Sequence, residues 1–297
     1  MKEHQNRREL LQIATAGAAA LVAGPVLGAE TNKKGKGRKK RSEAAASPAP
    51  TGSRTLPFEL GLASYTCRKF DLKTTLEMAK RVGFKHIALK DVHLPMKSTP
   101  DQIKEVVAQV KAAGLDLYGG GVIYMRNEAE VNQAFDYAKA AGMRVIIGVP
   151  EPPLLPLVDK KVKEYDIKVA IHNHGPTDKV YPVPATIYEK IKDLDKRIGL
   201  CNDIGHTVRA GVDPAASIEQ FADRLLDIHM KDETAAEAKG SATEVGRGVI
   251  NIPQVIRTLV KINYTGIVSF EYEKSDNDPL PGLAESVGYV RGVMAAI

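Results

Sequence analysis

Residues 169–175, 199–207, 225–233 and 267–273 read VAIHNHG, GLCNDIGHT, LLDIHMKDE and IVSFEYE. Each segment begins as an apolar run typical of a buried strand and ends in side chains that bind metals or move protons. The residues at these ends are His172, His174, Asp203, His206, His229, Asp232 and Glu271. Because the carboxyl ends of parallel barrel strands converge on one face, the pattern predicts an active site there.

The same alternation of apolar runs and amphipathic segments extends over residues 56–297, which we expect to form one domain. The expected strands cover residues 60–64, 86–90, 116–122, 144–149, 168–174, 198–203, 225–231 and 267–273. Buried strands separated by helices predict a parallel sheet, and eight units in about 240 residues match an α/β fold, the (β/α)8 TIM barrel. The alternative, a doubly wound open sheet, gives no reason for polar residues at four consecutive strand ends.

The first 55 residues lack the composition of a folded domain. Residues 1–29 contain the pair Arg7 and Arg8 and then a mildly apolar stretch interrupted by Pro25, which predicts a twin-arginine signal peptide. A membrane anchor is the alternative, which Pro25 and the many Ala and Gly residues disfavour. Residues 30–55 form a basic run followed by Ser, Ala and Pro, which predicts a disordered linker. We therefore expect an exported protein, periplasmic or extracellular, without stable membrane insertion after signal cleavage.

The basic character of the chain comes from this N-terminal part. Residues 1–54 carry 11 of the 42 Lys and Arg residues and 4 of the 36 Asp and Glu residues. The remainder therefore has 31 basic and 32 acidic residues, a net charge near −1. A domain of this charge offers no basic groove for a phosphate backbone, so nucleic acid is not an expected partner.

Two imidazoles and two carboxylates at the strand ends form a candidate metal site. Side chains alternate between the two faces of a strand, so His172 and His174 point the same way. A mixed set of nitrogen and oxygen ligands suits a divalent ion such as Mn, Zn, Co, Fe or Mg, without selecting one of them. The predicted metal ligands are His172, Asp203, His229 and Glu271.

Other polar residues near the strand ends are candidates for substrate binding: His174, His206, Lys90, Lys231 and Arg247. A structural role remains the alternative for each of them, such as a salt bridge for the lysines or a simple turn for residues 246–248. Glu271 is the candidate base, because a carboxylate held ionised in a barrel mouth near a cation can remove a carbon-bound proton.

Four motifs resemble the xylose-isomerase-like TIM-barrel superfamily of sugar phosphate isomerases and epimerases, over roughly residues 57–297. They are NDIGH at 202–206, IHMKD at 228–232, FEYE at 270–273 and VGRGVINIP at 245–253. The resemblance implies metal binding by Asp203, His229 and Glu271 and a substrate contact by His206. On the fifth strand the family has a catalytic glutamate, where this chain has His172. The resemblance therefore implies that one carboxylate, Glu271, and one imidazole replace the family's pair of glutamates, with His172 as the candidate partner.

The residues and the resemblance together predict an enzyme, a metal-dependent isomerase or epimerase of a sugar or keto-sugar that forms an enediolate. The same intermediate serves a lyase or dehydratase acting on a keto-sugar or keto-glycoside, which is the first alternative. A non-catalytic sugar-binding barrel is the second. The chain has no tryptophan and only 5% aromatic residues, so a small sugar is favoured over a long polysaccharide. An oligomer is possible, although no segment of the sequence identifies an interface.

Overall fold

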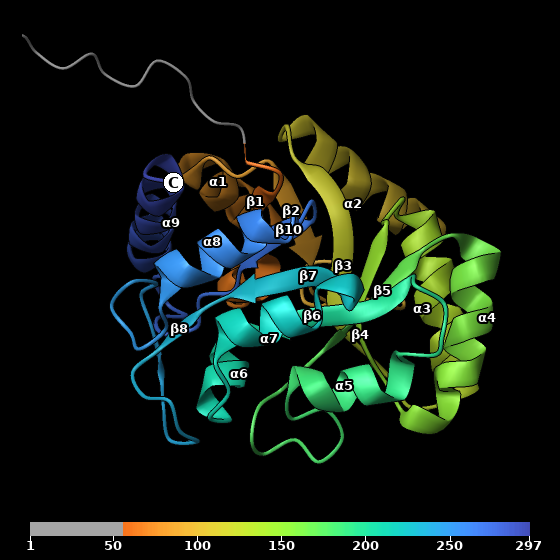
Figure 1. The fold of residues 1–297 in the computed structure, drawn as a ribbon. Coiled ribbons are helices and arrows are strands. Elements are labelled where there is room, and N and C mark those ends of the chain that lie inside the picture. Colours follow the sequence, from red (N-terminus) through yellow and green to blue (C-terminus); the bar gives the residue numbers. More distant parts are fainter. Residues whose placement is uncertain (1–55) are drawn as a thin grey trace, which may run out of the picture. The chain divides into compact units, whose positions relative to one another are not determined.

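The computed structural model describes residues 56–297. The predicted signal peptide and linker lie outside these residues. Eight parallel strands close into a barrel in the order β1-β10-β7-β6-β5-β4-β3-β2, as Figure 1 shows, and the predicted TIM barrel is confirmed. The strands are β1 (Glu59–Ala63), β2 (His86–Leu89), β3 (Asp116–Met125), β4 (Val145–Pro150), β5 (Lys168–His172), β6 (Ile198–Asp203), β7 (Leu225–Met230) and β10 (Ile267–Phe270).

Helices follow the strands along the chain and surround the barrel (Figure 1). They are α1 (Leu72–Val82), α2 (Pro100–Ala112), α3 (Glu128–Ala140), α4 (Leu155–Tyr165), α5 (Pro184–Ile191), α6 (Ile204–Arg209), α7 (Pro214–Gln220), α8 (Ile252–Lys261) and α9 (Leu280–Ala295). A short antiparallel pair, β8 (Asp232–Glu233) and β9 (Ala242–Thr243), lies in the connection between β7 and α8. Within residues 56–297, every helix is too short or too polar to cross a membrane.

The helix ends follow from local sequence. The Asp71 carboxylate accepts a hydrogen bond from the Thr74 backbone N–H at 2.8 Å and caps α1. The same helix stops at Gly83, whose φ of 81° lies in the left-handed region that glycine adopts without strain. At the start of α2, Thr99 and Gln102 form a reciprocal capping box. These signals divide the chain into its strand–helix units.

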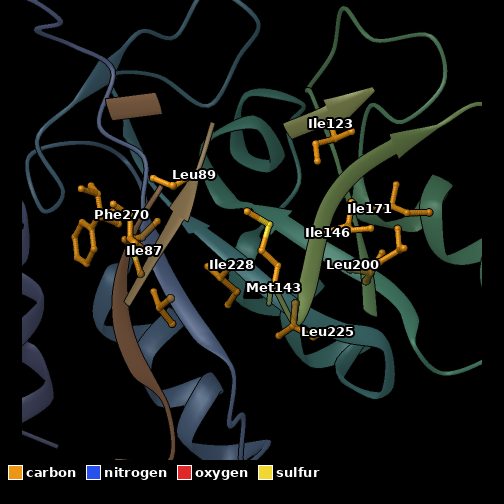
Figure 2. Packing of buried hydrophobic residues seen from close by; sticks show 14 of the residues in the cluster. Ile87, Leu89, Ile123, Met143, Ile146, Ile171, Leu200, Leu225, Ile228 and Phe270 are labelled. Carbon is orange, nitrogen blue, oxygen red and sulfur yellow. The ribbon is translucent and has the colours of Figure 1, made fainter. Parts of the chain in front are cut away.

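Alternate residues of each strand face either the helices or the barrel interior. Ile87, Ile146 and Ile171 belong to the large cluster packed between strands and helices, part of which Figure 2 shows. The inward-facing residues form a second cluster, which contains Ala88, Tyr118, Val145, Ile147, Ala170 and Cys201. The strand period of two therefore turns His172 and Asp203 inward, because they lie two residues beyond Ala170 and Cys201. This parity brings the polar strand ends to the centre of the barrel.

Three strands end two or more residues away from the expected position. β3 continues to Met125, three residues beyond the expected end, because residues 123–125 pair with the end of β4. β5 stops at His172, since the backbone N–H of His174 donates to Tyr181 O at 3.0 Å instead of joining the barrel sheet. The last barrel strand stops at Phe270, so Glu271 is the first residue after β10. His174 and Glu271 therefore lie just beyond their strands, at the mouth of the barrel.

Candidate active site and metal centre

Four buried side chains from adjacent strands meet inside the barrel mouth. His172 ends β5, Asp203 ends β6, His229 lies one residue before the end of β7, and Glu271 follows β10. His229 Nδ1 lies 3.1 Å from both His172 Nε2 and Glu271 Oε2. Asp203 Oδ2 lies 3.4 Å from His172 Nε2. Each residue offers one ligand atom, and the four atoms lie within 4.8 Å of one another.

Backbone contacts fix the orientation of Asp203. Its Oδ1 atom accepts the backbone N–H of His206 at 2.8 Å and caps α6, which leaves Oδ2 directed to the centre of the site. Asn173, which faces away from the cavity, accepts the backbone N–H of Asp203 at 3.0 Å and donates to Asp203 O at 3.3 Å. The ends of β5 and β6 are thereby joined, and the two ligand-bearing residues are held side by side.

The ammonium group of Lys231 lies among the carboxylates of the site. Its Nζ atom lies 3.0 Å from Asp203 Oδ2, 2.8 Å from Glu271 Oε2 and 2.8 Å from Glu273 Oε2. Burial favours the neutral amine, but the three carboxylates outweigh it and raise the pKa of Lys231 well above its usual value. Burial likewise opposes ionisation of Asp203 and Glu271, yet Lys231 holds the pKa of both carboxyls well below the usual range. Both are ionised at neutral pH.

The two histidines of the cluster differ in their charge. Burial lowers the pKa of His172 to about 3, so its imidazole is neutral and can act as a ligand. Burial also opposes protonation of His229, but the Glu271 carboxylate outweighs it and raises the pKa of His229 to about 8. Nδ1 of His229 therefore carries a proton towards Glu271 in the absence of a metal. A metal bound at this nitrogen would take the place of that proton.

The chemistry of these donors fits a divalent metal. Two imidazole nitrogens and two carboxylate oxygens form the mixed ligand set that Mn²⁺, Fe²⁺, Co²⁺ and Zn²⁺ accept. The remaining ring nitrogens, His172 Nδ1 and His229 Nε2, are buried and have no hydrogen-bond partner among the described residues. All four residues are at most 5% exposed, so a bound ion would be shielded from bulk water on the barrel side.

A cavity of 290 Å³ opens above this cluster. It is lined by Tyr65, Lys90, Val122, Tyr124, His172, His174, His206, Lys231, Glu271 and Glu273. The side near β7 and β10 is ionic, with Lys231 between Glu271 and Glu273. Imidazoles line the β5 and β6 side, and Tyr65 with the end of β3 supplies the apolar wall. An apolar wall facing polar groups suits a polyol, which has both C–H and hydroxyl surfaces.

Four of the five predicted substrate-binding residues lie in this cavity. The His174 ring stacks on Tyr124, with ring centroids 5.8 Å apart, and its Nε2 atom lies 3.2 Å from Tyr124 Oη. Burial lowers the pKa of both His174 and His206, so both are neutral at pH 7. Lys90 Nζ donates to Val122 O at 2.6 Å. The fourth, Lys231, forms salt bridges with Asp203, Glu271 and Glu273, which fits the structural alternative given for the lysines.

The fifth, Arg247, lies outside this cavity, so its predicted substrate contact stays a prediction. Its guanidinium group is 61% exposed and pairs with Glu285 on α9. The turn that carries it wraps around the Asp232 carboxylate, which accepts the backbone N–H groups of Gly246 at 2.9 Å and Gly248 at 3.0 Å. A Cβ atom on Gly248 would lie 2.2 Å from Asp232 Oδ1, so this turn needs glycine to hold Asp232. The alternative of a structural turn therefore fits residues 246–248.

Four cavity residues were not among the candidates from the sequence: Tyr65, Val122, Tyr124 and Glu273. Tyr65 lies in a 3-10 turn (Ser64–Cys67) directly after β1, where no charged group marked it as a candidate. Val122 was the last residue of the expected strand, and Tyr124 lies in the part of β3 that extends beyond it. The only signal in the sequence that could have placed Tyr65 at the cavity was its position just after the first strand.

A family model described as a xylose isomerase-like TIM barrel matches residues 72–293 of the chain. The chain belongs to this family. The resemblance predicted from the motifs at the strand ends is thereby confirmed.

Among curated proteins, this xylose isomerase-like barrel is similar to the rhizopine catabolism protein MocC of Rhizobium meliloti, with 25% identity over 152 residues. It is 22% identical over 152 residues to the inosose dehydratase of Geobacillus kaustophilus. These matches cover 44% and 43% of this chain and 44% and 45% of the two relatives, so the matched part spans less than half of their length.

Solved structures share the fold over most of the xylose isomerase-like barrel. L-ribulose 3-epimerase superposes with a TM-score of 0.66 at 15% identity, covering 80% of this chain and 95% of that chain. A xylose isomerase-like TIM barrel protein from Mycobacterium smegmatis, solved in complex with magnesium, superposes with a TM-score of 0.61 at 17% identity. That match covers 82% of this chain and 99% of the other. At these identities the likeness shows the common architecture.

Proposed function

We propose that the protein is a metal-dependent isomerase or epimerase of a sugar or keto-sugar, with Glu271 as the base. The observation that carries the proposal is the position of Glu271, whose Oε2 atom belongs to the four-donor cluster while the residue also lines the cavity. A carboxylate in this position can reach a substrate C–H bond beside the atom that a metal would polarise. Family membership supports the sugar substrate, since relatives carry names such as epimerase and dehydratase.

His172, Asp203, His229 and Glu271 would hold the metal. A bound divalent ion supplies Lewis acidity, which polarises a substrate carbonyl and makes the neighbouring C–H bond more acidic. The magnesium complex of a protein with the same fold supports a metal in this class of barrel.

The residues of this chain supply the proton transfers. Glu271 is ionised at neutral pH, because Lys231 stabilises its carboxylate, and it accepts the carbon-bound proton. The resulting enediolate keeps its negative charge near the Lys231 ammonium. The imidazoles of His174 and His206 line a different side of the cavity and are placed to return a proton or to bind hydroxyl groups. His172, predicted as the partner of Glu271, is 1% exposed and directs Nε2 into the donor cluster, which favours a ligand role.

Exchange of substrate C–H protons with D2O tests the proposal directly. We expect metal-loaded wild-type protein to exchange a C–H proton of at least one keto-sugar, and Glu271→Gln to lower the rate by about 10²–10⁴-fold. Glu273→Gln is the matched control, because Glu273 contacts the same ammonium but lies outside the four-donor cluster. Metal content measured on each sample separates loss of the base from loss of the ion. Equal exchange by wild type and Glu271→Gln at equal metal content would refute the role of Glu271.

A lyase or dehydratase is the second candidate, favoured by the similarity to inosose dehydratase. Elimination begins with the same proton removal by Glu271, so exchange alone does not separate the two reactions. Mass spectrometry of the product does, because isomerisation conserves mass and dehydration removes 18 Da, about the mass of one water. A sugar-binding barrel without catalysis would bind a sugar without metal and without exchange.

A further inference from the structure

A second hollow, of 270 Å³, lies beside the first cavity. It is bordered by the connection after β2, the end of β3 and the start of α3. Six of its lining residues do not line the first cavity: Asp91, Met96, Ile123, Arg126, Glu130 and Gln133. Lys90, Val122 and Tyr124 line both hollows. These three residues therefore form the shared border of the two hollows, and the reactive groups lie on one side of it.

The side chains of the second hollow leave it without a free charge. The ammonium of Lys90 lies 3.6 Å from Asp91 Oδ1, and the guanidinium of Arg126 lies 3.8 Å from Glu130 Oε2. Glu130 also accepts the Arg126 backbone N–H at 2.7 Å. Two basic groups paired with two acidic ones do not select an anion, so the hollow is poorly suited to a phosphate.

The remaining lining combines apolar and hydrogen-bonding groups. Met96 and Ile123 supply apolar surface, and the Gln133 side-chain N–H donates to Met96 O at 3.0 Å, which leaves its carbonyl oxygen as an acceptor. Tyr124 contacts both sides, since its ring stacks with His174 and lies 5.0 Å from the Arg126 guanidinium carbon. Apolar surface beside hydrogen-bonding groups and mutually paired charges matches a sugar ring, which has both C–H and hydroxyl surfaces.

The dimensions indicate room for two units. Ligand pockets commonly occupy roughly 300–1,000 Å³, and the first cavity, at 290 Å³, lies just below this range. The two hollows taken together lie well within it. We propose that the second hollow is a subsite for the second sugar unit of an uncharged glycoside, while the unit that reacts lies against Glu271. This inference rests on the proposed function for the identity of the reacting unit.

Calorimetric titration of metal-loaded protein tests the subsite without requiring turnover. The probes are glucose and three glucose disaccharides, maltose, cellobiose and trehalose. We expect at least one disaccharide to bind tenfold or more tightly than glucose, and Met96→Trp to abolish the difference by filling the second hollow. Gln109→Trp is the matched control, because Gln109 lines a separate hollow on α2 that shares no residue with either.

Arg126→Ala provides a second test that makes no demand on the core, since the Arg126 side chain is 62% exposed. It should weaken disaccharide binding threefold or more and leave the affinity for glucose within a factor of two. Glucose binding as tight as that of every disaccharide, or a disaccharide preference that survives Met96→Trp, would overturn the inference. Proton exchange on keto derivatives of the same sugars tests the proposed function separately, so binding without exchange would overturn the proposed function and retain the subsite.

Discussion

Lys231 and a bound metal would share the same oxygen atoms. Its ammonium contacts Asp203 Oδ2 and Glu271 Oε2, the atoms that these residues contribute to the four-donor cluster. Without a metal, the ammonium compensates charges that would otherwise be buried and unpaired. A metal bound to these oxygens would lie close to the positive charge of the Lys231 ammonium. The residue therefore stabilises the metal-free site at the expense of metal affinity.

Removing this ammonium should tighten metal binding. We expect Lys231→Met to lower the dissociation constant for Mn²⁺ at least tenfold, because even two unit charges about 4 Å apart repel by about 4 kcal/mol at an effective dielectric constant of 20, and Mn²⁺ carries two charges. Equilibrium dialysis at pH 7.5 measures the change, with Lys196→Met as a control that removes an exposed ammonium paired with Asp223. Unchanged or weaker Mn²⁺ binding by Lys231→Met would show that the ammonium does not compete with the metal.

Among the elements, the connection between β7 and α8 is tied to the residues after β10 through Glu244. Tyr272 Oη donates to Glu244 Oε1 at 2.9 Å, and Lys274 Nζ donates to Glu244 Oε2 at 2.7 Å. The hydrogen bond from Lys274 is the main cause that lowers the pKa of Glu244 to about 2. Because Glu271 and Glu273 belong to the same segment as Tyr272 and Lys274, this contact also steadies the edge of the cavity.

Acid should weaken this connection. Folding lowers the pKa of the Glu244 carboxyl from about 4.5 in the unfolded chain, so ionised Glu244 stabilises the native state at pH values above 4.5. This stabilisation disappears as the pH falls towards 2. Since Lys274 is 47% exposed, we expect about 1 kcal/mol. Urea unfolding should show Glu244→Gln less stable than wild type by this amount at pH 7, with the difference vanishing near pH 2. A difference that is the same at both pH values would contradict the assignment.

Among the elements, the sequence predicted the strands better than the connections between them. Apolar runs ending in His172, Asp203 and His229 located β5, β6 and β7, because buried parallel strands are apolar on both faces, although β5 ends two residues earlier than expected. The position of Arg247 outside the cavity could not be predicted, since a glycine-rich turn can wrap either a ligand or, as here, the carboxylate of Asp232. Side chains after strands depend on loop conformation, which the strand period does not determine.

For the whole molecule, closure of the barrel assembles the site. The donors extend from His172 to Glu271, about a hundred residues along the chain, and become neighbours because β5, β6, β7 and β10 are adjacent in the sheet. The sequence predicted their convergence from the geometry common to TIM barrels. It left Lys231 open between a substrate contact and a salt bridge, because the choice depends on side-chain packing between β6, β7 and β10.

Closure depends on contacts between the two ends of the described chain, and Thr66 makes two of them. Its buried hydroxyl accepts the Tyr272 backbone N–H at 2.9 Å and donates to Phe270 O at 3.3 Å, on either side of Glu271. Thr66→Val keeps the shape but leaves both backbone groups unpaired, which should cost about 2 kcal/mol and lower Tm by about 4–8 °C.

Because both hydrogen bonds flank Glu271, Thr66→Val should also slow C–H exchange about tenfold or more through misplacement of the base. Thr66→Ser, which retains the hydroxyl, is the control, and thermal unfolding together with the exchange rate at equal metal content gives the two measurements. A lower Tm with unchanged exchange would show that Thr66 closes the barrel without positioning Glu271. If Val and Ser behave alike in both measurements, the hydroxyl has neither role, and the position of Glu271 then depends on its contacts with His229 and Lys231.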